Sequence, residues 1–137
     1  MLVDYTLVLL ATVAQFALGA LWYSPLLFGK WWMEIMECTK MSKAELEKMQ
    51  KSMMPFYGLQ LFLTFFTTVS FANLLPYIPA FGAYHVAFWI WIGFIAPAIV
   101  SSVIWGKTEK KFWAKQLFVM LTMNLVGIML AAWILVM

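Results

Sequence analysis

Four long apolar runs of sequence constrain the fold of this chain more than any other feature. They cover residues 2–23, 55–75, 84–105 and 112–136, and none has a charged residue in its central part. Each run has about 20 residues or more, the length that an α-helix needs to cross a hydrocarbon core about 30 Å thick. Because lipid offers the backbone no hydrogen bonds, each run must be a helix. The sequence therefore predicts an all-α integral membrane bundle of four transmembrane helices.

The composition agrees with a membrane protein and excludes a soluble domain. Of the 137 residues, 65% are hydrophobic and 11% are charged, whereas about a quarter of a soluble domain is charged. The length predicts a single domain over residues 1–137. The single cysteine, Cys38, excludes an internal disulfide. The N-terminus lacks the basic residues of a signal peptide, so we expect it to be retained as part of the first helix.

The basic residues predict the orientation of the chain. All of them are lysines, and they lie in the loop at about residues 24–54 and around the loop after the third apolar run. Short basic loops stay in the cytoplasm. We therefore expect both termini and the loop at residues 76–83 to lie outside. The clusters are Lys30, Lys40, Lys43, Lys48, Lys51 and Lys107, Lys110, Lys111, Lys115. We interpret them as orientation signals and expect no nucleic-acid partner.

The first cytoplasmic loop is too long to be a simple connection, and it predicts one or two short amphipathic interfacial helices. Ser24 and Pro25 have the residue types of an N-cap and a first helical position, so one helix is expected over residues 25–37. Ser42 and Glu45 have the spacing of a capping box and predict a second helix.

One stretch of this region has a recognisable pattern. It reads Gly19-x-x-Trp22-Tyr23-Ser24-Pro25-Leu26-Leu27-Phe28-Gly29-Lys30-x-Trp32-Met33. This pattern resembles the signature of a family of small bacterial membrane proteins defined as domain of unknown function 1761. The resemblance implies a four-helix fold over nearly the whole chain and a location in the bacterial cytoplasmic membrane. It assigns no activity, substrate or catalytic residue.

Four polar residues are predicted to lie near the middle of the membrane at similar depth: Gln15, Thr64, Thr68 and Asn124. They could line the pathway of a small oligomeric channel or transporter. They could instead form hydrogen bonds between helices, which are worth about 0.6 kcal/mol each on average. The sequence leaves both interpretations open.

Small residues recur at four-residue spacing in three of the apolar runs, and such spacing lets helices approach closely. The first run has Ala11, Gln15 and Gly19, the third has Gly93, Pro97 and Ser101, and the fourth has Gly127 and Ala131. These stripes predict helix packing within one chain or between copies, and we expect a homo-oligomer. Pro97 is expected to distort the third helix.

The chain contains no motif typical of an enzyme. It lacks a nucleophile paired with a base and a Gly-rich phosphate loop. We therefore predict a protein that is not an enzyme, without catalytic residues, cofactor or bound metal. The favoured function is a membrane module that binds lipid or another membrane protein through the aromatic residues of the first loop. These candidate surface residues are Trp22, Tyr23, Phe28, Trp31 and Trp32.

Overall fold

A computed structural model describes residues 3–36, 41–78 and 82–137 of the chain, and these residues form helices and no strands. The first two long helices are α1 (Tyr5–Trp22) and α4 (Met54–Leu74), which the 3-10 turn η1 (Leu75–Tyr77) extends. The third span consists of α5 (Ala83–Ile90), the π-helical turn η2 (Trp91–Ile95) and α6 (Ala96–Ile104). The fourth is α7 (Trp113–Leu135), preceded by the 3-10 turn η3 (Lys110–Phe112). Two short helices, α2 (Gly29–Ile35) and α3 (Lys43–Ser52), connect α1 to α4.

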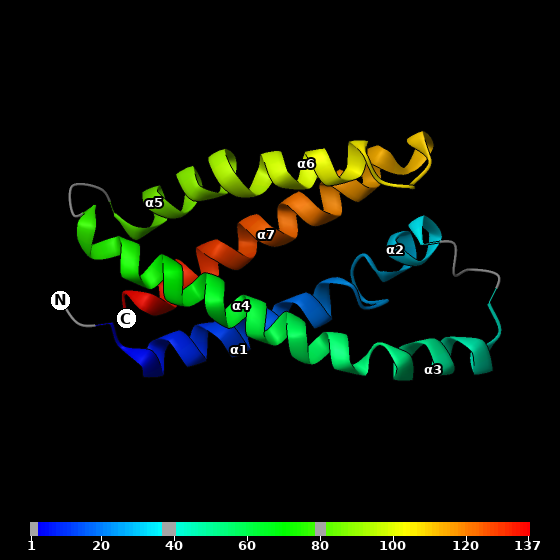
Figure 1. The fold of residues 1–137 in the computed structure, drawn as a ribbon, viewed down its shortest axis with the longest axis horizontal. Coiled ribbons are helices and arrows are strands. Elements are labelled where there is room, and N and C mark those ends of the chain that lie inside the picture. Colours follow the sequence, from blue (N-terminus) through cyan, green and yellow to red (C-terminus); the bar gives the residue numbers. More distant parts are fainter. Residues whose placement is uncertain (1–2, 37–40, 79–81) are drawn as a thin grey trace.

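The predicted all-α fold with four membrane-length helices is confirmed. The four segments that are long and apolar enough to cross a membrane are Tyr5–Trp22, Met54–Tyr77, Ala83–Ile104 and Lys110–Leu135. Helix α7 lies in the middle of the bundle and packs against α1 on one side and against α5 and α6 on the other (Figure 1). Helix α1 also packs against α4. Helix α4 crosses the bundle obliquely (Figure 1), and Phe71 near its C-terminal end lies in the same core cluster as Val86 and Ala87 of α5.

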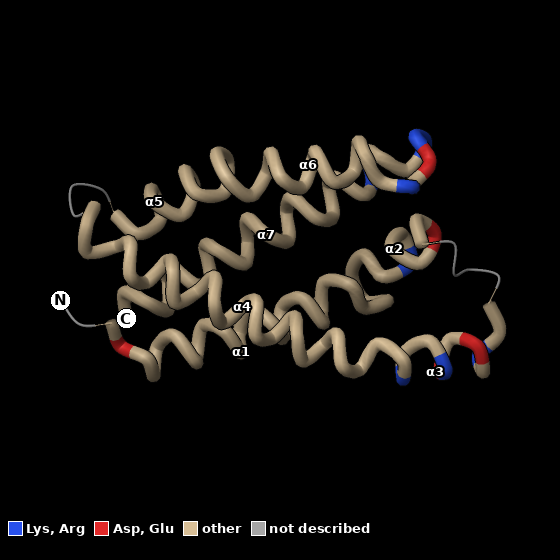
Figure 2. The backbone as a smooth tube through the Cα atoms, in the orientation of Figure 1, with Lys and Arg blue, Asp and Glu red and all other residues tan. Residues whose placement is uncertain are grey.

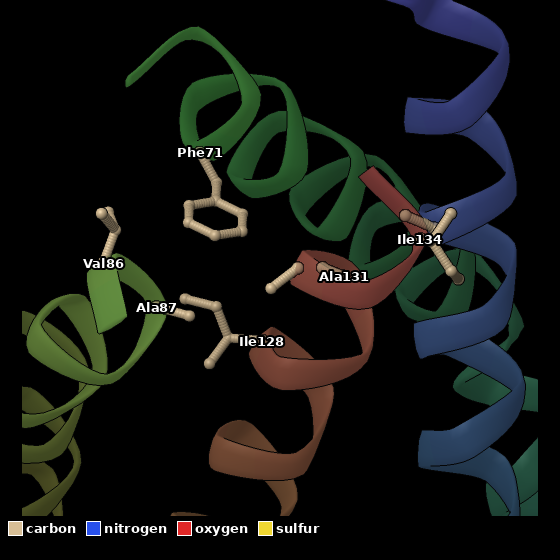
Figure 3. Packing of buried hydrophobic residues seen from close by; sticks show 8 residues of the cluster. Phe71, Val86, Ala87, Ile128, Ala131 and Ile134 are labelled. Carbon is tan, nitrogen blue, oxygen red and sulfur yellow. The ribbon is translucent and has the colours of Figure 1, made fainter. Parts of the chain in front are cut away.

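The hydrophobic core is small and lies where α4, α5 and α7 meet. Phe71 of α4 points toward Ala87 of α5 and Ile128 of α7 (Figure 3). Much of the rest of this core is alanine, including Ala131 and Ala132, so the helices can approach closely. These residues belong to the end of the bundle that contains both chain termini (Figure 1). The opposite end must be held together by other contacts.

Two of the helices begin with side-chain caps. The Asp4 carboxylate accepts hydrogen bonds from the backbone N–H groups of Thr6 and Leu7, at 3.0 and 3.3 Å. The predicted capping box of α3 is confirmed, because Ser42 Oγ accepts from the Glu45 N–H and Glu45 Oε2 accepts from the Ser42 N–H. None of the residues of α3 is buried, so this helix extends beyond the packed bundle.

The third span has a widened turn directly before Pro97. In η2 the N–H of Ala96 bonds to the carbonyl of Trp91, five residues back, as in a π-helix. Pro97 has no N–H to bond to the carbonyl of Gly93, so the regular α-helical ladder cannot continue through this point. The distortion expected at Pro97 is therefore a π turn.

The charged residues separate along the long axis of the bundle. Every lysine among the described residues lies at the end of the molecule that contains α2, α3 and the loop before α7 (Figure 2). Lys40 and Glu37 lie outside the described residues. Asp4 is the one acidic residue of the described chain at the opposite end, beside the two termini (Figure 2).

Candidate functional site

The chain passes from α1 to α2 through a tight turn at residues 23–28. The N–H of Phe28 donates to the carbonyl of Trp22 at 3.0 Å, and the N–H of Gly29 donates to the carbonyl of Ser24 at 2.8 Å. A Cβ atom at position 29 would lie 2.5 Å from the carbonyl carbon of Ser24. Only glycine permits such a close approach of two backbone segments.

This turn corrects the predicted start of the first interfacial helix. The helix was expected at Pro25 with Ser24 as its cap, but α2 begins at Gly29. Ser24 Oγ instead donates to the carbonyl of Leu21 at 2.6 Å, at the end of α1. The backbone of Ser24 is needed to close the turn onto Gly29, so the helix cannot begin before Gly29.

The five aromatic residues singled out in the sequence come together around this turn. Trp22 lies 5.0 Å from Phe28 between ring centroids, and Tyr23 lies 4.8 Å from Trp32. These separations are within the range of favourable aromatic pairs. We call the following set the aromatic collar: Trp22, Tyr23, Phe28, Trp31, Trp32 and Phe118.

Phe118 of α7 is the member of the collar that sequence reasoning missed. Its ring centroid lies 5.6 Å from that of Phe28 and 6.2 Å from that of Trp31, in edge-on geometry. Phe118 thus joins the turn to a helix that lies about 90 residues later in the chain. An apolar residue in an apolar helix gives no local signal of such a contact.

Two tryptophans fix α7 from opposite sides. Trp22 Nε1 donates to the carbonyl of Val119 at 3.1 Å, and Trp91 Nε1 donates to the carbonyl of Leu121 at 3.0 Å. Trp22 therefore points inward rather than serving only as an anchor in the headgroup layer. The Trp22 bond and the aromatic collar hold the bundle end that lacks the Phe71 core, whereas Trp91 packs against that core.

An ion pair lies beside the aromatic collar. Lys115 Nζ of α7 lies 3.5 Å from Glu34 Oε2 of α2 and 5.4 Å from the centroid of the Trp31 ring. Both charged side chains are close to half exposed, so the pair contributes at most about 1 kcal/mol. Burial raises the pKa of the Tyr23 hydroxyl, which therefore stays neutral at physiological pH.

The outer surface of the collar is apolar and is bordered by lysines. Leu26 is 81% exposed, and Leu27 and Trp31 are also exposed. Lys30, the second residue of α2, is exposed as well. Exposed leucine and tryptophan next to lysine are typical of segments that lie at the boundary between headgroups and acyl chains.

Three of the four predicted mid-membrane residues, Gln15, Thr64 and Thr68, are linked by hydrogen bonds. Gln15 Nε2 of α1 donates to Thr68 Oγ1 of α4 at 2.8 Å, and Thr68 Oγ1 donates to the carbonyl of Thr64 at 2.7 Å. Thr64 Oγ1 donates to the carbonyl of Gln60, whose side chain bonds back to Thr64 at 3.4 Å. Gln60 was not among the predicted residues.

Asn124 does not join this chain of hydrogen bonds. It is exposed, and its amide donates to the carbonyl of Met120 in its own helix at 2.8 Å. One surface pocket lies near Asp4 and Pro76 and another at the junction of α3 and α4, and none of the four predicted polar residues lines either of them.

Two of the small-residue stripes pack against each other inside the chain. A Cβ atom at Gly19 of α1 would lie 3.5 Å from Met123 Cε, and one at Gly127 of α7 would lie 3.8 Å from Gln15 Oε1. The stripes of α1 and α7 are therefore used within the fold. In the third span, a Cβ atom at Gly93 would meet nothing within 4 Å.

Metal-ligand residues do not cluster in the described part of the chain. No group of three His, Cys, Asp or Glu side chains among those residues is placed to hold a metal ion. Cys38 lies outside the described residues.

The comparisons with known proteins bear on the whole chain. A family model described as "Protein of unknown function (DUF1761)" matches residues 6–136. No curated protein and no solved structure matches the chain. The matched range includes the turn at Gly29 and the whole aromatic collar.

Proposed function

Because the chain belongs to the family of unknown function DUF1761, we propose its function from the structure alone: it is a membrane module that binds anionic phospholipid headgroups through the aromatic collar. It is not an enzyme. It resides in the bacterial cytoplasmic membrane with both termini outside and the collar at the cytoplasmic face. One observation carries this proposal: α2, which belongs to the segment with the collar and the exposed leucines, lies at the same end of the bundle as the lysines (Figure 2).

The distribution of lysines supports the orientation. Lysine-rich short loops stay in the cytoplasm, and the described lysines lie at one end of the bundle (Figure 2). With that end in the cytoplasm, the collar meets the leaflet surface that carries a negative potential.

The chemistry of binding divides between two kinds of side chain. Leu26, Leu27 and Trp31 enter the boundary of the acyl chains, where burial of apolar surface is favourable. Lys30 is exposed next to Trp31 in α2, and Lys107 is exposed at the same end of the bundle (Figure 2); both meet the phosphate groups. Each lysine near an anionic surface contributes about 1 kcal/mol, equivalent to about fivefold in affinity.

Lipid fits this surface better than a protein partner does. The exposed apolar part of the turn is two adjacent leucines, Leu26 and Leu27, with Trp31 beside them. A stable protein interface buries about 1,200 Å² or more, which is much larger than such a tip. Two leucines and one tryptophan are, however, enough to enter the boundary between the headgroups and the acyl chains.

The lipid preference is testable in nanodiscs. Purified protein is placed in mixed phosphatidylglycerol and phosphatidylcholine discs, and the lipids retained are counted by native mass spectrometry. The double variant Lys30→Gln/Lys107→Gln should lose most of the preference for phosphatidylglycerol. The control Lys43→Gln/Lys48→Gln removes the same charge from α3, away from the collar, and should retain it. Equal retention of both lipids by the unmodified protein, or retention of a protein instead, would contradict the proposal.

The orientation is tested by labelling cysteines in intact bacterial cells with a membrane-impermeant maleimide. In a Cys38→Ser background, Tyr77→Cys should react from outside, whereas Lys48→Cys and Lys110→Cys should react only after the cells are opened. Reaction of Lys110→Cys in intact cells would reverse the proposed topology.

A further inference from the structure

A surface pocket lies where the short helix α3 is joined to the membrane-length helix α4. Its volume is about 360 Å³, and it is lined by Glu47, Gln50, Lys51, Met54 and Tyr57. None of these residues belongs to the aromatic collar. The lining combines a carboxylate, an ammonium, an amide and a phenol, so the pocket offers hydrogen-bond donors and acceptors at one place.

The sequence places these residues on one side of the joint between the two helices. Helix α3 ends at Ser52 and α4 begins at Met54, so Met53 alone connects them. Pro55 has no N–H to bond to the carbonyl of Lys51, so the helical ladder is interrupted at this point. The lining residues follow one another at intervals of three or four positions, the spacing that places side chains on one face of a helix. The pocket therefore continues along one face across the joint.

The two charged residues of the pocket are not paired with each other. Glu47 and Lys51 lie four positions apart on α3, a spacing at which opposite charges commonly pair. Among the residues that the structure describes, ion pairs form in the loop before α7 and between α2 and α7, but not between Glu47 and Lys51. Both side chains are exposed. They are therefore available to a ligand that brings a cation to Glu47 and an anion to Lys51.

The lining of the pocket changes from polar to apolar in the direction of the membrane. Its three residues from α3 precede the membrane-length segment Met54–Tyr77. Met54 and Tyr57 lie in the first turn of that segment and are 64% and 46% exposed. Tyrosine is enriched at the boundary between headgroups and acyl chains. The charged groups thus lie at the level of the headgroups, and Met54 lies where the acyl chains begin.

We propose that this pocket binds the headgroup of phosphatidylethanolamine. The phosphate of this lipid meets the Lys51 ammonium and accepts from the Tyr57 hydroxyl, and the lipid ammonium donates to the Glu47 carboxylate. Hydrogen bonds between charged groups are stronger than those between neutral groups. Phosphatidylcholine has the same net charge but no N–H donor for Glu47, and phosphatidylglycerol has no cation. The pocket therefore selects a different headgroup class from the one proposed for the aromatic collar.

Lipid retention tests the headgroup preference. In nanodiscs of equal phosphatidylethanolamine and phosphatidylcholine, the unmodified protein should retain mainly phosphatidylethanolamine, as counted by native mass spectrometry. The variant Glu47→Gln/Lys51→Gln should lower the ratio of retained phosphatidylethanolamine to phosphatidylcholine about fivefold. Helix α3 has no buried residue, so this variant should fold. Equal retention of the two lipids by the unmodified protein would overturn the proposal.

A matched control makes the same two changes on α3 outside the pocket. Glu45→Gln/Lys48→Gln alters residues that do not line it, and glutamine also serves in a capping box. This control should leave the ratio of the two lipids unchanged. A decrease as large as that of Glu47→Gln/Lys51→Gln would contradict the proposed site.

The two lipid sites can fail separately. Lys30→Gln/Lys107→Gln leaves the pocket unaltered and should keep the preference for phosphatidylethanolamine over phosphatidylcholine. Glu47→Gln/Lys51→Gln does not change the net charge and should keep the preference of the aromatic collar for phosphatidylglycerol. Loss of both preferences in either variant would contradict two independent sites.

A zero-length cross-link locates the lipid ammonium. A water-soluble carbodiimide joins a carboxylate to a primary amine where the two are in contact, so phosphatidylethanolamine in nanodiscs should form an amide with Glu47. Peptide mass spectrometry identifies the modified residue, and Glu45 is the internal control. Soluble phosphoethanolamine at the concentration of the lipid should not reduce the adduct, because it has no acyl chains to lie beside Met54. Equal reaction at Glu45 and Glu47, or displacement by soluble phosphoethanolamine, would overturn the proposal.

Discussion

Trp22 Nε1 lies 3.1 Å from the carbonyl oxygen of Val119, a residue 97 positions later in the chain. Val119 is fully buried, so this bond joins the end of the first long helix to the beginning of the last. Phe71 and its neighbours hold the opposite end of the bundle (Figure 3). One end of the protein is thus stabilised by a tryptophan hydrogen bond and aromatic contacts, and the other by hydrophobic packing.

Trp22→Phe should lower the free energy of unfolding by about 0.5–1.5 kcal/mol, the usual net value of one hydrogen bond. The phenyl ring keeps part of the contact with Phe28 but cannot donate to Val119. Unfolding in mild detergent, followed by tryptophan fluorescence, measures the effect. Trp105→Phe is the control, because Trp105 is 85% exposed. Equal effects of the two substitutions would show that the bond does not hold the bundle.

Gly29→Ala should destabilise the turn by more than about 1 kcal/mol, because overpacking against rigid atoms forces the backbone to move. The added methyl would lie 2.5 Å from a backbone atom of Ser24. Gly58→Ala is the matched control, since nothing lies within 4 Å of its Cβ position in α4. There the substitution should be neutral or stabilising, because alanine favours the helix. Melting temperatures in detergent distinguish the two, and an unchanged value for Gly29→Ala would refute the close approach.

Hydropathy and length were sufficient to predict the four long helices, because the bilayer imposes one structure on each apolar run. The capping box of α3 was also predicted, since Ser42 and Glu45 are three residues apart and interact locally. The start of α2 was not predicted correctly, because it depends on the contact between Gly29 and Ser24. A local preference for Pro25 at a first helical position does not reveal that contact.

The long-range partners of the site could not be predicted from local patterns. Phe118 and Lys115 join the collar from α7, and nothing in their neighbourhood distinguishes them from other residues of that helix. Gln15 and Thr68 were expected at similar depth, and the structure pairs them. Asn124 was expected at the same depth but faces a different direction, and depth alone does not specify direction around a helix.

A double-mutant cycle should detect the bond between Gln15 and Thr68. We expect a coupling energy of about 0.6 kcal/mol between Gln15→Leu and Thr68→Val, typical of side-chain bonds between membrane helices. The pair Gln15→Leu and Asn124→Leu should be additive, because Asn124 bonds only within α7 among the described contacts. Coupling to Asn124 as large as coupling to Thr68 would contradict this arrangement.

The same variants test the channel alternative. If Gln15 and Thr68 serve packing, the flux of small solutes through reconstituted liposomes should be equal for the unmodified protein and for Gln15→Leu and Asn124→Leu. A flux that the unmodified protein supports and both variants abolish would favour a polar pathway instead.

Tyr23 should make the stability of the bundle fall at alkaline pH. Burial raises the pKa of its hydroxyl above the ordinary value of 10.0. At a pH between 10.0 and the higher pKa of the folded state, the unfolded chain therefore binds fewer protons than the folded one. Stability from this group is therefore complete below pH 10 and decreases as the pH rises toward the folded-state pKa. Tyr23→Phe keeps an aromatic ring for Trp32, 4.8 Å away in the unmodified protein, and removes the titrating group. The difference in tyrosinate absorbance between the two proteins isolates Tyr23, and a midpoint at or below 10 would contradict its burial.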